Sequence, residues 1–117
     1  GCQTVTRVHT PDTDYDTGVW KDGRIGTFRG IRKNKADYGL TVFGEKGILP
    51  VAGSFSGYDG LCVEIARFFK TGKAPVSPEE TIEIFAFMEA ADESKRQGGK
   101  PVSVPEVLER ARKAAGL

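Results

Sequence analysis

The chain has 117 residues and a net charge of +1, which fits one ordinary domain and predicts no field that would steer it onto nucleic acid. Hydrophobic residues make up 38% of the sequence, but no apolar run reaches the roughly 20 residues of a membrane helix. The polar N-terminus, residues 1–5, lacks the basic start and apolar block of a signal peptide. We therefore expect no nucleic-acid partner, no membrane partner and a cytoplasmic location.

Two cysteines, Cys2 and Cys62, lie far apart in the sequence and form no CxxC motif or metal-ligand cluster. This usage favours two reduced thiols in a reducing compartment.

The first half of the chain carries the strand signals. Runs rich in β-branched and aromatic residues, separated by turn residues, predict strands over residues 4–10, 18–21, 24–31, 38–44 and 48–51. Asp22-Gly23 indicates a tight hairpin turn between the second and third of these strands. Consecutive hairpins predict a largely antiparallel sheet.

The second half is helical in pattern, with apolar stripes at helical spacing over residues 58–70, 77–96 and 103–115. Ser77-Pro78-Glu79-Glu80 and Ser103-Val104-Pro105-Glu106 are capping boxes that open the last two helices. Strands followed by helices indicate an α+β fold. We expect a single domain, residues 1–117, with an open, mostly antiparallel sheet and about three helices packed on one face.

Motifs of a self-sufficient enzyme are missing from the sequence. It contains neither the G-x-G-x-x-G turn of a dinucleotide site nor a P-loop. Residues 53–57 resemble a nucleophile elbow, but Phe55 stands where the nucleophile is needed, which favours a loop. Since a single histidine is present, an independent small enzyme is the least favoured interpretation.

Residues 12–18, Asp-Thr-Asp-Tyr-Asp-Thr-Gly, have the carboxylate spacing that opens a calcium-binding loop. The glycine falls one residue late, and Gly23 stands where a bidentate glutamate is needed. A solvated loop between strands is the favoured interpretation, with calcium binding as the alternative.

Several polar and aromatic side chains of the strand region are candidates for a binding surface. His9 shares the Arg7 side of the first strand and is expected to be a sheet-face or interface residue rather than a general base. Arginines 7, 29 and 32 could bind an anion, although solvated strand charges are the favoured interpretation. The aromatic residues are expected to pack in the core or to line an exposed sheet face; they are Trp20, Phe28, Tyr38 and Phe43.

The helical half also carries a longer pattern. Residues 64–81 contain "EIARFFKTGKAPVSPEET", and residues 87–94 contain "FMEAADES". This pattern resembles the C-terminal end of the Gfo/Idh/MocA family of NAD(P)-dependent oxidoreductases. Residues 19–30 and 42–47 resemble the middle of the same domain, so the resemblance covers nearly the whole chain.

The resemblance implies an α+β domain that contributes substrate-site walls and subunit contacts, while an upstream Rossmann domain binds NAD(P) and carries the chemistry. It implies no catalytic and no cofactor-binding residue in this chain, because the family's catalytic histidine and lysine have no matching positions. Glu45-Lys46-Gly47 lacks the proline of the lysine motif. The full-length protein would act on a sugar or polyol. Five residues are candidates for the substrate site or an interface: His9, Trp20, Arg29, Arg32 and Tyr38.

An open sheet face of this kind predicts a homo-oligomer. The alternative is a stand-alone, non-catalytic binding or interaction module of the same fold. The coding sequence immediately upstream distinguishes the two, because a G-x-G-x-x-G strand-turn-helix there supports the oxidoreductase.

Overall fold

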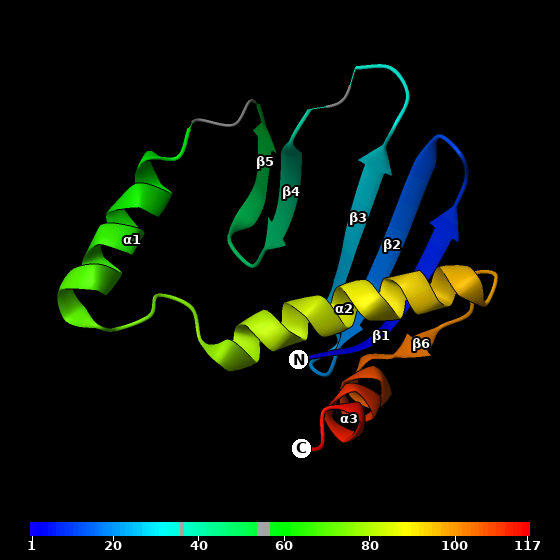
Figure 1. The fold of residues 1–117 in the computed structure, drawn as a ribbon. Coiled ribbons are helices and arrows are strands. Elements are labelled where there is room, and N and C mark those ends of the chain that lie inside the picture. Colours follow the sequence, from blue (N-terminus) through cyan, green and yellow to red (C-terminus); the bar gives the residue numbers. More distant parts are fainter. Residues whose placement is uncertain (36, 54–56) are drawn as a thin grey trace. The chain divides into compact units, whose positions relative to one another are not determined.

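The computed structural model describes residues 1–35, 37–53 and 57–117 of the chain (Figure 1). These residues form two compact units. Unit 1 combines residues 1–33 with residues 76–117, and unit 2 comprises residues 34–75.

Unit 1 is built on a four-stranded antiparallel sheet. Its strands are β1 (Cys2–His9), β2 (Thr13–Trp20), β3 (Ile25–Ile31) and the two-residue β6 (Val102–Ser103), in the order β3-β2-β1-β6. Each neighbouring pair is antiparallel. The N-terminal strand therefore lies between β2 and the strand contributed by the C-terminal half of the chain.

A four-residue connection, residues 21–24, joins β2 to β3. The N–H of Gly23 donates to the Trp20 carbonyl at 2.9 Å, and the N–H of Trp20 donates to the Arg24 carbonyl at 2.9 Å. Gly23 adopts a φ of 85°, a left-handed conformation that glycine reaches without steric cost. The hairpin expected at Asp22-Gly23 is thus present.

Two helices, α2 (Pro78–Arg96) and α3 (Val104–Ala114), pack against this sheet. Each helix begins where its capping box predicts. The hydroxyl of Ser77 accepts the N–H of Glu80, and the hydroxyl of Ser103 accepts the N–H of Glu106. Small residues of α2 lie over β1, which lets the helix approach the sheet closely. The buried core of the unit consists of Cys2, Val5, Ala86, Ala90, Ala91, Val102, Val104 and Val107.

Unit 2 contains the hairpin of β4 (Gly39–Gly44) and β5 (Gly47–Ala52) and the helix α1 (Asp59–Thr71). Gly72 ends α1 in a left-handed conformation, and its N–H donates to the Phe68 carbonyl at 2.8 Å. No described residue of this unit is buried.

The expected α+β class with antiparallel strands is confirmed. Three details differ from expectation. The strands form two sheets rather than one, since β4 and β5 pair in a sheet of their own. Strand β2 starts at Thr13 rather than at Gly18, because Asp14 and Asp16 find cationic partners on the face of the sheet that α2 covers. Strand β6 arises from the helical half of the chain and pairs with β1 at Thr4 and Val5.

Candidate functional site

The two faces of the unit 1 sheet have different chemistry, because side chains alternate across a strand. The covered face carries Val5, Arg7 and His9 of β1 with Asp14 and Asp16 of β2, and it is packed against α2. The other face, which we call the open face, has no helix of unit 1 against it.

Trp20 lies on the covered face as a packing residue. Its ring stacks on Phe87 of α2, with the ring centroids 6.2 Å apart and the planes at 26°. Gly18 and Gly26 leave room for this stack, since a Cβ at Gly18 would lie 2.7 Å from the Phe87 ring. The geometry therefore gives Trp20 a role in holding α2 on the sheet.

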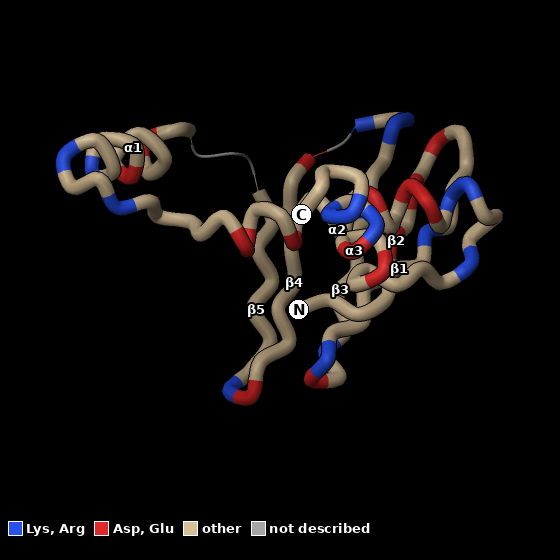
Figure 2. The backbone as a smooth tube through the Cα atoms, turned by 60° about the horizontal axis from the view of Figure 1, so that its bottom comes forward, with Lys and Arg blue, Asp and Glu red and all other residues tan. Residues whose placement is uncertain are grey.

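A charged cluster occupies the other end of the covered face. The Nε of Arg7 donates to Oδ1 of Asp14 at 2.9 Å and lies 3.7 Å from Oδ1 of Asp16. The Nη1 of Arg7 donates to Oδ1 of Asp92 in α2 at 2.5 Å. Arg7 therefore joins β1, β2 and α2 through ionic contacts, and in Figure 2 acidic and basic segments adjoin each other in this part of the sheet.

Asp14 is the centre of the cluster, with only 6% of its side chain exposed. Besides Arg7, its carboxylate contacts the Nδ1 of His9 at 2.6 Å and the Nη2 of Arg32, just after β3. An ionised carboxylate only accepts hydrogen bonds, so we assign the proton of neutral His9 to Nδ1. The Nε2 of His9 then has a free lone pair.

Two groups of the cluster titrate abnormally. Burial raises the pKa of Asp16 above its usual 3.8, although the charge of Arg7 opposes the shift. Oδ1 of Asp16 is buried and has no hydrogen-bond partner. Partial desolvation, together with the positive charges of Lys95, Arg32 and Arg7, lowers the pKa of His9 below 6.5.

The interpretation of residues 12–18 as a solvated loop is wrong. Asp14 and Asp16 are buried in β2, because Arg7 and Arg32 compensate their charge. The calcium alternative also finds no support, since arginines occupy the face where a cation would bind. Within the described ranges, no group of three or more His, Cys, Asp or Glu residues could hold a metal ion.

The open face presents apolar side chains to solvent. Val8 pairs across the sheet with Tyr15, and Val19 pairs with Ile25, with exposed fractions between 37% and 68%. A row of threonines, Thr6, Thr17 and Thr27, crosses the middle. Thr4, Thr13, Ile31 and Arg29 also lie on this face, and Arg29 is the one charged side chain among its described strand residues.

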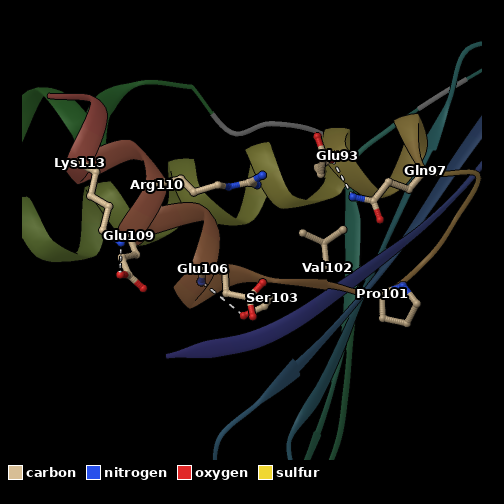
Figure 3. Close-up of a pocket in the computed structure, with 9 residues that line it drawn as sticks. All are labelled: Glu93, Gln97, Pro101, Val102, Ser103, Glu106, Glu109, Arg110 and Lys113. Atoms are coloured by element: carbon tan, nitrogen blue, oxygen red, sulfur yellow. Dashed lines mark hydrogen bonds and ion pairs between the residues drawn. The ribbon is translucent and has the colours of Figure 1, made fainter.

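A groove of about 340 Å³ lies between the end of α2, β6 and α3 (Figure 3). Its charges are mixed: Lys113 pairs with Glu109 at 2.7 Å, and the amide of Gln97 donates to Glu93 at 2.7 Å. None of the five predicted site residues lines it, and its charges neither concentrate one sign nor converge on a point. The full lining is Glu93, Gln97, Pro101, Val102, Ser103, Glu106, Glu109, Arg110 and Lys113.

The five predicted site residues do not form one site. His9 and Arg32 meet at Asp14, whereas Trp20 packs on Phe87 elsewhere on the covered face, and Arg29 lies on the open face. Tyr38 belongs to unit 2 and is 78% exposed. The loop expected at Phe55 lies outside the described residues.

Asp14, Asp16 and Asp92 were not predicted from the sequence as partners of Arg7. One signal was present: Arg7 and His9 are two residues apart, as are Asp14 and Asp16, so each pair occupies one face of a strand. The pairing of the two strands, which brings the four together, depends on the register Arg7–Asp16 and His9–Asp14.

No helix in the part of the chain that the structure describes is both long and apolar enough to cross a bilayer.

No family model, no curated protein and no solved structure matches the chain.

Proposed function

We propose that the chain is the C-terminal domain of a Gfo/Idh/MocA-like oxidoreductase. In this role it contributes walls of the substrate site and subunit contacts, while an upstream Rossmann domain binds NAD(P) and carries the chemistry. The proposal rests on the resemblance of residues 64–81 and 87–94 to that family. The structural observation that supports it is the open face, where apolar residues that a monomer would bury are left in solvent.

A second copy of the chain is the partner that suits the open face best. Apart from Arg29 the face is neutral, and it is rich in threonine and β-branched side chains. Two copies related by a two-fold axis would meet with the same patch on both sides, so little like-charge repulsion would arise. Tyr15 is 43% exposed on this face, and tyrosine is among the residues that most often contribute strongly to interface binding energy.

His9 and Arg32 are the substrate-site candidates that the geometry favours. They lie together on Asp14 and are 32% and 46% exposed, so a small molecule can reach both. A free imidazole nitrogen and a guanidinium offer an acceptor and several donors, which suits the hydroxyl groups of a sugar or polyol.

The first test combines light scattering with titration of NADH into the chain. The proposal predicts a concentration-dependent oligomer and no saturable NADH binding, because the residues that would hold the cofactor belong to another domain. If the chain stays monomeric at high concentration, the proposed interface is contradicted. Tight NADH binding would contradict the proposal that an upstream domain binds the cofactor.

The stand-alone interaction module remains the alternative class. An open reading frame that starts at this domain would favour it, whereas an upstream strand-turn-helix with G-x-G-x-x-G would favour the oxidoreductase. Both interpretations use the open face, so the reading frame rather than the oligomeric state separates them.

A further inference from the structure

One buried carboxylate holds three basic side chains. Asp14 contacts Arg7 and His9 through Oδ1 and Arg32 through Oδ2. These partners arrive from β1 and from the end of β3, and each would carry a positive charge if His9 were protonated. The carboxylate carries a single negative charge, which three positively charged partners would then have to share.

The charges around Asp14 balance only while His9 is neutral. The carboxylates are Asp14 and Asp16 of β2 and Asp92 of α2. The cations that act on the same place are Arg7 of β1, Arg32 after β3 and Lys95 of α2. Lys33 pairs with Asp12 at 3.5 Å, and the two charges of this pair cancel. A proton on the Nε2 of His9, taken from solvent, therefore adds an uncompensated positive charge.

We propose that this cluster is an acid-sensitive anchor for the segment that leaves unit 1: protonation of His9 displaces the Arg32 guanidinium from Asp14 and releases residues 32 and 33. The inference does not depend on the oxidoreductase assignment, since it concerns contacts within unit 1 alone.

Of the two arginines that contact Asp14, we expect Arg32 to be displaced, because it has fewer ionic contacts and is more exposed. Arg7 has three carboxylate partners and is 15% exposed, whereas Arg32 has one carboxylate partner and is 46% exposed. The other side-chain contact of Arg32 is a long hydrogen bond to the Thr10 carbonyl at 3.4 Å. Solvent can rehydrate a guanidinium at that position at little cost, whereas Arg7 cannot leave without stranding buried carboxylates.

The release has a defined place in the chain. Residues 32 and 33 are the last residues of the first segment of unit 1, and unit 2 begins at Asn34. Their remaining anchors are the backbone bond from the N–H of Arg32 to the Asp12 carbonyl at 2.9 Å and the Lys33–Asp12 pair. Loss of the Asp14 contact would therefore increase the freedom of residues 32 and 33, where the first segment of unit 1 ends, under mildly acidic conditions.

Nuclear magnetic resonance provides a direct test, because His9 is the only histidine of the chain and its ring signals are unambiguous. The Nε–Hε signal of Arg32 and the amide-exchange protection of residues 32 and 33 are followed through the His9 titration. The expected result is that both change together with the ring, and that the pKa of His9 lies below 6.5.

Three variants sharpen the test. Arg32→Gln raises the pKa of His9, since it removes a neighbouring positive charge, and His9→Gln abolishes the pH response of the Arg32 signal. The matched control is Arg24→Gln, which removes an exposed arginine paired with Asp22 and leaves the His9 titration unchanged. An Arg32 signal that ignores the His9 titration, or equal effects of Arg32→Gln and Arg24→Gln, would overturn the proposal.

Discussion

The hydroxyl of Ser94 in α2 accepts the backbone N–H of Arg7 in β1 at 2.9 Å and donates to the Lys100 carbonyl at 2.7 Å. Ser94 is fully buried, so this one side chain joins the end of α2 both to the sheet and to the turn that follows the helix. It belongs to the "EAADES" segment, and the neighbouring Asp92 pairs with the side chain of Arg7.

Ser94→Ala should destabilise the protein by about 1–3 kcal/mol, because the N–H of Arg7 and the carbonyl of Lys100 both lose the partner that the buried hydroxyl supplies. Urea unfolding followed by circular dichroism measures the change. Thr27→Ala on the open face is the control and should cost less than about 1 kcal/mol, since its side chain is exposed. Equal costs for the two variants would contradict the role given to Ser94.

Gly18→Ala should destabilise unit 1 by roughly 1–3 kcal/mol through overpacking. The added Cβ would lie 2.7 Å from the Phe87 ring and 2.9 Å from the Trp20 ring. Gly60→Ala is the matched control, because a Cβ there meets nothing within 4 Å. Thermal unfolding, with tryptophan fluorescence as the probe of Trp20, should show a lower midpoint for Gly18→Ala only.

Asp14 and Asp16 should respond differently to neutralisation. Asp14→Asn weakens the contacts of three basic groups and should cost about 2–4 kcal/mol, whereas Asp16→Asn should cost less than about 1 kcal/mol or stabilise the fold. Asp16 has no hydrogen-bond partner at Oδ1, and Arg7 keeps Asp14 and Asp92 without it. Chemical denaturation of both variants at neutral pH measures the contrast, and a larger loss for Asp16→Asn would refute it.

The same carboxyl predicts a dependence on pH. Because the folded-state pKa of Asp16 lies above the unfolded value of 3.8, the folded protein binds this proton more tightly in the range just above 3.8. Acidification through that range therefore relieves the cost of burying the charge. The stability difference between Asp16→Asn and the wild type should be largest at neutral pH and shrink as the pH falls towards about 4. A difference that stays constant over this range would count against a raised pKa.

Local signals explain which parts of the fold could be predicted. The starts of α2 and α3 follow from Ser77 and Ser103, whose hydroxyls accept hydrogen bonds from the N–H groups three residues further along the chain. The end of α1 follows from Gly72, and the β2–β3 turn follows from Gly23. Each of these features depends on a few adjacent residues.

The remaining features depend on partners that are distant in the sequence. Aspartates are depleted in strands, so Asp14 and Asp16 argue against a strand until Arg7 and Arg32 are brought beside them. Strand β6 has two residues, and only its pairing with β1 defines it. The meeting of His9 with Arg32 at Asp14 likewise requires the three-stranded register, which no local pattern reports.

Sedimentation equilibrium of the wild type beside Thr17→Arg tests the proposed interface most directly. Thr17 lies in the central row of the open face, so an arginine there would place a charge in the interface of both copies. Gln97→Arg adds the same charge at an exposed position at the end of α2, away from that face, and serves as the control. We expect the wild type and Gln97→Arg to associate and a folded Thr17→Arg variant to be monomeric. Association of all three to the same extent would contradict the open face as the subunit contact.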